Sequence, residues 1–179
     1  MAIFHTSIVL ILVSIILISI SPSSIAHKLT DTEIKHLCSK TRNPEGCYTI
    51  LKSDHRTANI DAKGLAQVSL DLASERARKI QAQLNAFAKA THDSRLRNVY
   101  ESCSKKYDDI VHDLEAAKKN LRSKHVPIRV KDASEENKSC EKVLDGASTS
   151  DRTYLQKKIQ DVKFMLTIVK VMWDNLNKK

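Results

Sequence analysis

One regular stripe of apolar residues, between Leu96 and Leu121, constrains the fold of this chain more than any other feature. The steps between its members alternate between four and three residues: Leu96, Tyr100, Cys103, Tyr107, Ile110, Leu114, Ala117 and Leu121. Side chains at these spacings lie on one face of an α-helix, so the stripe predicts a long helix with one side buried against other helices. Asp93 is its expected N-cap. We expect the helix to fray over residues 123–126, just before Pro127.

Other segments carry helical patterns of the same kind. A long helix is predicted over residues 61–90, a shorter one over 128–144, and a last one after Asp151, which is its expected cap. Gly146 is expected to end the third of the four helices as a C-cap. Because the chain has only three glycines and three prolines, long uninterrupted elements are favoured. Short connections force antiparallel neighbours, so the sequence predicts an all-α, up-down-up-down four-helix bundle over residues 60–179.

Two short helices precede the bundle and form a predicted hairpin over residues 27–53. The first begins with the capping-box spacing Thr30-Asp-Thr-Glu33. The second begins at Asn43, with Pro44 at its first helical position. Neither helix is long enough to be stable alone. Residues 53–59 are expected to form a polar link to the bundle.

The first 26 residues predict a secretory signal peptide. They contain no Lys, Arg, Asp or Glu, and an apolar run over residues 8–20 precedes small residues at Ser24 and Ala26. A membrane anchor is the alternative, but a helix needs roughly 20 apolar residues to span a bilayer, and this run is shorter. We therefore expect the mature chain to be exported to the extracellular space and to contact no membrane after cleavage.

The mature chain is strongly basic, because every charged side chain lies after residue 26 and the full net charge of +9 is kept. Such a charge first suggests a nucleic acid partner, but export argues against it. Acidic polysaccharides and anionic protein surfaces are the polyanions that an exported chain meets. A basic surface without a dedicated partner is the alternative.

Four cysteines remain after cleavage: Cys38, Cys47, Cys103 and Cys140. An even number of cysteines in an exported chain indicates disulfides, and the count alone allows three connectivities. No Cys-x-x-Cys pair is present, so the spacing does not favour zinc. The sequence Asn137-Lys-Ser139 is a sequon, which predicts N-glycosylation of Asn137 in an exported chain.

The sequence predicts no catalytic residue, metal or cofactor. It lacks a P-loop, a Gly-rich dinucleotide loop, G-x-S-x-G and H-E-x-x-H. One cluster brings Asp109 and His112 within a helical turn of each other. Because Ile110 and Leu114 point into the predicted core, both polar side chains should lie on a solvated face. An enzyme that uses this cluster is the least favoured of the alternatives.

The chain resembles a plant family, the invertase and pectin methylesterase inhibitors, across residues 27–179. The resemblance rests on the order and spacing of these motifs: Cys38-Ser-Lys-Thr-Arg-Asn-Pro-Glu-Gly-Cys47, Cys103-Ser-Lys-Lys-Tyr-Asp-Asp109 leading into Asp113-Leu-Glu115, and Cys140-Glu-Lys-Val-Leu-Asp-Gly146. It implies a four-helix bundle with an N-terminal helical hairpin, and disulfides Cys38–Cys47 and Cys103–Cys140. It also implies a non-catalytic protein of the plant cell wall that binds and blocks a carbohydrate enzyme.

The resemblance implies two candidate targets with different contact regions. For pectin methylesterase, the leading hypothesis, the helices around the third and fourth cysteines would meet the enzyme, with Asp109, Asp113 and Ser139 as contacts. For cell-wall or vacuolar acid invertase, the family carries Pro-Lys-Phe after the long central helix, where this chain has Pro127-Ile128-Arg129. A binding or storage-like bundle of the same fold, without inhibition, is the third hypothesis. Acidic pectin is a further expected partner of the basic surface.

Overall fold

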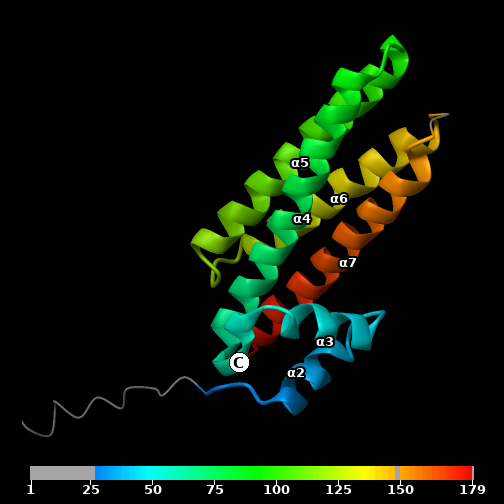
Figure 1. Cartoon of the computed structure of the whole chain (residues 1–179). Helices are drawn as coiled ribbons and strands as arrows, with labels where there is room; N and C mark the ends of the chain where they lie inside the picture. The colour runs from blue at the N-terminus through cyan, green and yellow to red at the C-terminus, as the bar shows by residue number, and fades with distance from the viewer. Residues whose placement is uncertain (1–26, 148–149, 179) are drawn as a thin grey trace, which may run out of the picture.

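Four long helices and a short helical hairpin make up residues 27–147 and 150–178, the part of the chain described by a computed structural model (Figure 1). In chain order the elements are α2 (Asp31–Cys38), α3 (Pro44–Lys52), the 3-10 helix η1 (His55–Asn59), α4 (Ala62–Ala90), α5 (Ser94–Lys119), α6 (Val126–Asp145) and α7 (Arg152–Leu176). Within these ranges no helix is long and apolar enough to cross a membrane. The predicted signal peptide, residues 1–26, lies outside the described residues.

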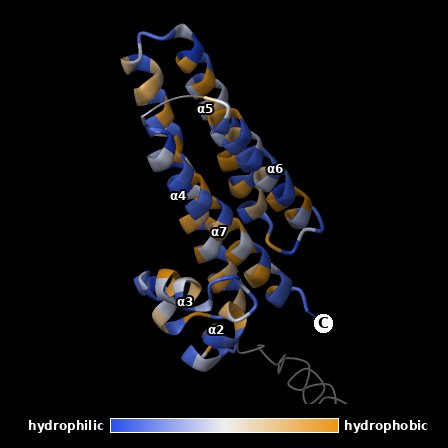
Figure 2. Ribbon diagram, turned by 90° about the vertical axis from the view of Figure 1, so that its right-hand side faces the viewer, coloured by the Kyte–Doolittle hydropathy of each residue, from blue (hydrophilic) through white to orange (hydrophobic). Residues whose placement is uncertain are grey.

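The four long helices run in alternating directions, and each packs against two of the others (Figure 1). α4 contacts α5 and α7, and α6 contacts the same two helices, so the α5–α6 side and the α4–α7 side lie on opposite edges of the bundle. Figure 2 shows hydrophobic and hydrophilic residues alternating along each long helix, as expected for helices with one buried face. The predicted all-α fold is confirmed.

The predicted apolar stripe on α5 lies in the centre of the core. Its seven members after Leu96 are at most 6% exposed, and Leu96 is half-buried. Asp93 caps this helix as predicted, because its carboxylate accepts hydrogen bonds from the backbone N–H groups of Arg95 and Leu96. The stripe therefore faces the apolar sides of neighbouring helices over the whole length of α5.

The connection after α5 differs from the prediction. α5 ends at Lys119, and Leu121 is buried in the turn that follows. The Leu121 carbonyl accepts a 2.7 Å hydrogen bond from the indole Nε1–H of Trp173, which ties the turn to α7. α6 then begins at Val126, two residues earlier than predicted, with Pro127 in its first turn, where the missing N–H removes no helical hydrogen bond.

Two predicted caps lie at helix ends, as expected. Gly146 is the C-cap of α6, with φ of −78°, and its backbone N–H donates to the carbonyls of Lys142 and Leu144. Asp151 precedes α7 but makes no side-chain capping bond there. Its carboxylate instead accepts a hydrogen bond from the Tyr100 hydroxyl at 3.2 Å, which links α5 to the start of α7.

The predicted hairpin is present and packs against α7 at one end of the bundle (Figures 1 and 2). A disulfide joins Cys38 to Cys47, with their Cα atoms 5.5 Å apart. The predicted capping box forms at Thr30, and the Asn43 side chain caps α3 by accepting from the backbone N–H of Gly46. These contacts hold two helices that are too short to be stable alone.

The link between hairpin and bundle contains η1, which the sequence does not predict, and an ion-pair network that fixes it to α4 and α5. Arg56 Nη1 lies 2.6 Å from Asp71 Oδ2, and Lys118 Nζ lies 2.7 Å from Asp71 Oδ1. Arg56 also binds Asp54, and the hydrogen bonds from Arg56 lower the pKa of Asp54 to about 2. Partial burial acts to raise the pKa of Asp71, but the hydrogen bonds from Lys118 and Arg56 outweigh it, and that pKa is also lowered.

We expect the free energy of unfolding to fall as pH drops from about 4 towards 2. A carboxyl group with a lowered folded-state pKa stabilises the fold above its unfolded pKa, and that stabilisation is lost as pH falls through the folded value. Urea unfolding across this pH range measures the effect. An Asp54→Asn/Asp71→Asn variant should show a shallower decline, and a decline as steep as that of the unmodified chain would contradict the assignment.

Candidate functional site

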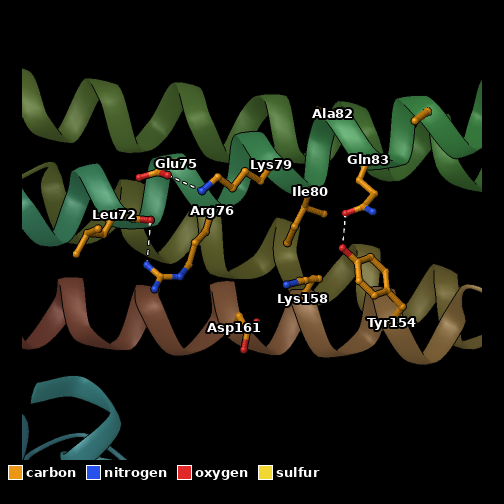
Figure 3. A pocket seen from close by; sticks show the side chains of 11 residues that line it. Leu72, Glu75, Arg76, Lys79, Ile80, Ala82, Gln83, Tyr154, Lys158 and Asp161 are labelled. Atoms are coloured by element: carbon orange, nitrogen blue, oxygen red, sulfur yellow. Dashed lines mark hydrogen bonds and ion pairs between the residues drawn. The ribbon is translucent and has the colours of Figure 1, made fainter. Parts of the chain in front are cut away.

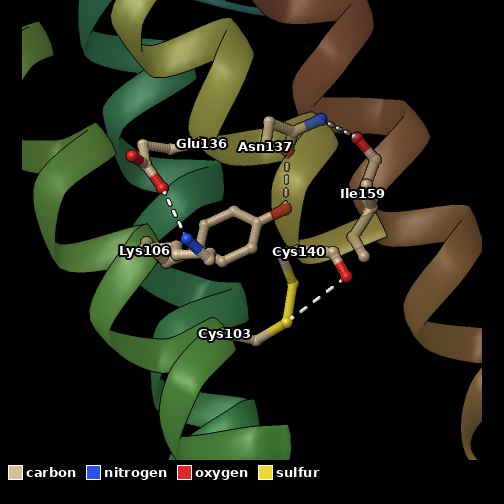
Figure 4. Close-up of a disulfide and its surroundings, with 7 residues drawn as sticks. Cys103, Lys106, Glu136, Asn137, Cys140 and Ile159 are labelled. Atoms are coloured by element: carbon tan, nitrogen blue, oxygen red, sulfur yellow. Dashed lines mark hydrogen bonds and ion pairs between the residues drawn. A yellow bond between two sulfur atoms is a disulfide. The ribbon is translucent and has the colours of Figure 1, made fainter. Parts of the chain in front are cut away.

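The α5–α6 side of the bundle is joined covalently by the disulfide between Cys103 and Cys140 (Figure 4). Their Cα atoms are 5.0 Å apart, and both residues are fully buried. Together with Cys38–Cys47, this bond confirms both disulfides that the family resemblance implies. Because it connects the interior of α5 to α6, the two helices cannot separate or slide while it is intact.

Asn137 lies in the core next to this disulfide. Its side chain is 1% exposed, its Oδ1 accepts a 2.7 Å hydrogen bond from the Tyr107 hydroxyl, and its Nδ2 donates to the Ile159 carbonyl at 3.3 Å (Figure 4). Burial raises the pKa of Tyr107, so its hydroxyl stays protonated and remains a donor. The Asn137 amide therefore connects α5, α6 and α7 at one point.

This packing argues against the predicted glycosylation of Asn137. An N-linked glycan replaces a hydrogen on Nδ2, but in the fold that atom is enclosed by the core and bonded to α7. We expect the folded, secreted protein to carry no glycan at this position. Intact mass before and after treatment with a peptide N-glycosidase measures this, with Ser139→Ala as a control that removes the sequon. A glycan mass present in the unmodified chain and absent from the control would contradict the expectation.

Two ion pairs cross between α5 and α6 at the surface. Lys106 Nζ lies 2.9 Å from Glu136 Oε2, and Arg129 Nη1 lies 2.9 Å from Asp113 Oδ1. Partly exposed pairs of this kind contribute about 0–1 kcal/mol each, so their main effect is to hold four long side chains in place. The pair with Glu136 also neutralises Lys106, which the sequence alone presents as an unpaired positive charge.

The structure places the predicted contact residues on two neighbouring helices, α5 and α6. We define the α5–α6 surface by its partly or fully exposed members: Lys106, Asp109, Asp113, Pro127, Ile128, Arg129, Glu136 and Ser139. Asp113 and Arg129, predicted as contacts for two different enzymes, are bonded to each other, so the two predicted regions adjoin. Asp109 is exposed one turn before Asp113, and Ser139 is partly exposed one turn after Glu136.

The exposed side of α6 carries apolar side chains that favour contact with a partner. Ile128 is 55% exposed, and it shares one face of the helix with Ser139 and with Val143, which is 36% exposed. Sequence reasoning missed Val143, although its spacing from Ile128 could have shown it. Pro127 also borders an apolar groove of about 450 Å³ between α6 and α7, which Trp173 helps to line.

The alternative of a catalytic or metal-binding cluster gains no support from the geometry. Asp109 and His112 are both exposed, as expected from the inward position of Ile110 and Leu114. Across residues 27–147 and 150–178, no three His, Cys, Asp or Glu side chains are grouped so that they could hold a metal ion.

The chain is similar in sequence to known proteins. The sequence profile of a family described as "Plant invertase/pectin methylesterase inhibitor" matches residues 32–175. A pectinesterase inhibitor from Actinidia deliciosa is 39% identical over 90 residues, which are 50% of this chain and 49% of that protein. A cell wall / vacuolar inhibitor of fructosidase from Arabidopsis thaliana is 32% identical over 106 residues, 57% of each protein. The matches thus span about half the length of these relatives.

A solved structure shows the same fold. The crystal structure of a mutant form of a pectin methylesterase inhibitor from Arabidopsis superposes with a TM-score of 0.70. The alignment covers 82% of this chain and 99% of that one, with 22% sequence identity. At this level of identity the similarity concerns the arrangement of the helices.

Proposed function

This chain belongs to the plant invertase/pectin methylesterase inhibitor family, and from that premise we propose that it inhibits a pectin methylesterase. The observation that carries the proposal is the family match over residues 32–175, joined to 39% identity with a pectinesterase inhibitor. The matched range includes all four cysteines and the whole α5–α6 surface. The family consists of inhibitors, so the function is binding and not catalysis.

Inhibition would follow from docking of the rigid α5–α6 surface on the enzyme. The Cys103–Cys140 disulfide and the two ion pairs between these helices fix the surface before binding. A preformed surface loses little conformational entropy on association, so more of the contact energy remains as affinity. Asp109, Ser139 and Ile128 would make the direct contacts. The complex would be non-covalent and would exclude the polymer substrate by covering its path.

The proposal includes export to the cell wall after cleavage near residue 26. The charge of +9 supports a second part of it, retention on acidic pectin, because the mature chain keeps every charged side chain. This retention should weaken as salt screens the charges. Binding to a demethylated pectin column that is unchanged at high salt would count against it.

A paired inhibition assay tests the main proposal. Oxidised protein of residues 27–179 would be titrated against a plant pectin methylesterase and against a cell-wall acid invertase at mildly acidic pH. We expect saturable inhibition of the methylesterase and none of the invertase. Inhibition of neither enzyme, by protein shown to be folded, would overturn the proposal and favour a binding or storage-like bundle of the same fold.

Inhibition of acid invertase is the second candidate. It is supported by the similarity to the inhibitor of fructosidase and by the exposure of Pro127 and Ile128 at the start of α6. Under this alternative the titration would inhibit invertase alone, and Ile128→Asp would remove the effect. Under the main proposal the titration would inhibit the methylesterase.

A further inference from the structure

An open groove of about 710 Å³ runs between α4 and α7, on the edge of the bundle opposite the α5–α6 surface (Figure 3). Its volume is within the range of small-molecule sites. Its lining combines apolar, aromatic and charged side chains: Leu72, Glu75, Arg76, Lys79, Ile80, Ala82, Gln83, Ala86, Tyr154, Lys158 and Asp161. None of these residues belongs to the α5–α6 surface.

An exposed aromatic ring stands at one end of this groove. Tyr154 is 42% exposed, and its hydroxyl donates a 2.6 Å hydrogen bond to Oε1 of Gln83 across the groove (Figure 3). That bond fixes the ring and leaves the Gln83 amide N–H groups available. A fixed ring beside a hydrogen-bonding amide suits a sugar, which offers an apolar C–H face and a rim of hydroxyl groups.

The same groove holds two cations that have no carboxylate within ion-pair distance among the described residues. Lys158 Nζ lies 5.6 Å from the centre of the Tyr154 ring, and Arg76 Nη1 makes a weak 3.4 Å hydrogen bond to the Leu72 carbonyl. The third cation differs, because Lys79 is bound to Glu75 at 2.6 Å. Arg76 and Lys158 are partly buried, where a carboxylate ligand would be screened less than on an open surface.

We propose that this groove binds a short stretch of a uronic-acid polymer such as de-esterified pectin. One sugar ring stacks on Tyr154, and the carboxylates of two successive sugar units pair with Lys158 and with the planar guanidinium of Arg76, which matches a carboxylate in a two-bond geometry. A methyl ester cancels the charge and removes both pairs, so the free acid binds more tightly. The choice of uronic acid among polyanions rests on the proposed function, since a pectin methylesterase produces these carboxylates.

The consequence is an inhibitor with two separate binding surfaces. Because the groove and the α5–α6 surface lie on opposite edges of the bundle, polymer and enzyme can bind at the same time. The inhibitor would then be held on the product of the enzyme that it blocks, and inhibition would concentrate where de-esterification has already occurred.

Calorimetric titration with an oligogalacturonate, and with its methyl ester, tests the inference. We expect saturable binding of the free acid and binding of the ester that is at least about tenfold weaker, the change that 1.4 kcal/mol produces. Arg76→Gln/Lys158→Gln should weaken binding of the acid by at least the same factor, and so should Tyr154→Ala. Asp161→Asn, which removes a negative charge from the lining, should strengthen it.

The matched control is Lys63→Gln/Lys89→Gln, which removes two positive charges from exposed positions of α4 outside the groove. It should change the affinity less than about twofold, and circular dichroism establishes that each variant is folded. If the control loses as much affinity as Arg76→Gln/Lys158→Gln, the binding depends on net charge alone, and the groove is not the binding site. Two results together would overturn the assignment to a sugar. They are binding of polyglutamate as tight as that of the oligogalacturonate, and an unchanged affinity of Tyr154→Ala for the oligogalacturonate.

Inhibition of the methylesterase separates this inference from the proposed function. The groove variants should inhibit the enzyme as well as the unmodified chain does. Protein that binds the oligogalacturonate but inhibits no enzyme would leave the groove in place and overturn the proposed function. Protein that inhibits the methylesterase but does not bind the oligogalacturonate would overturn the groove and support the proposed function.

Discussion

Replacement of Cys103 and Cys140 by alanine should lower the free energy of unfolding by about 3.8 kcal/mol. The bond closes a loop of 37 residues, and the loop-entropy relation gives this value for that length. The stabilisation arises because the intact bond restricts the unfolded chain. In the fold it connects two helices of the bundle, so its loss also loosens the α5–α6 surface.

Urea unfolding of the double-alanine variant measures this effect. The matched control is Cys38→Ala/Cys47→Ala, whose sequence separation of 9 predicts a smaller loss of about 2.6 kcal/mol. Both variants remove two buried sulfur atoms, so the loss of packing is similar in each. The test is therefore which variant loses more free energy of unfolding. A larger loss in the hairpin variant would contradict the view that the second disulfide is the main staple of the bundle.

Ser139→Arg should raise the inhibition constant towards pectin methylesterase at least about 100-fold, which corresponds to about 2.7 kcal/mol. Ser139 is a small, partly exposed residue of α6 within the α5–α6 surface. A long charged side chain at its position would separate two surfaces that must fit closely, and it would bury a charge without a partner. Asp109→Lys, on the neighbouring helix, should have an effect in the same direction.

Ala82→Arg is the control for this prediction. It adds the same side chain at an exposed position of α4, on the edge of the bundle away from the α5–α6 surface. It should inhibit the methylesterase as strongly as the unmodified chain. Full inhibition by Ser139→Arg together with lost inhibition by Ala82→Arg would move the enzyme contact to the α4–α7 side.

The periodicity of the sequence is enough to predict the helices and the core of this fold. The stripe on α5 alternates steps of four and three without interruption, so its buried side follows from the order of the residues alone. The ends of the helices are less predictable. Leu121 continues the stripe but is buried in a turn, where the indole N–H of Trp173, 52 residues later in the chain, donates to its carbonyl.

The candidate site is predictable only in part, since its properties depend on pairs of distant residues. Asp113 and Arg129 were expected to contact different enzymes, and only the antiparallel packing of α5 and α6 brings them within 2.9 Å of each other. Asn137 belongs to a sequon, which is typical of a surface position, yet α6 turns it into the core towards Tyr107. Local sequence patterns predict helices, but the burial of Asn137 and the pairing of Asp113 with Arg129 depend on how the helices pack.

Carboxylate labelling of this chain in the presence of a pectin methylesterase tests the central claim most directly. Water-soluble carbodiimide modifies exposed carboxylates, and mass spectrometry reads the extent at each position. We predict that the enzyme protects Asp109 on α5, while Asp161 on α7 stays fully reactive. Asp132 and Glu135 should be protected as well, because these exposed residues of α6 lie one turn from Ile128 and one turn from Ser139. Protection of Asp161 with unchanged labelling of Asp109, or no protection at any position, would contradict docking through the α5–α6 surface.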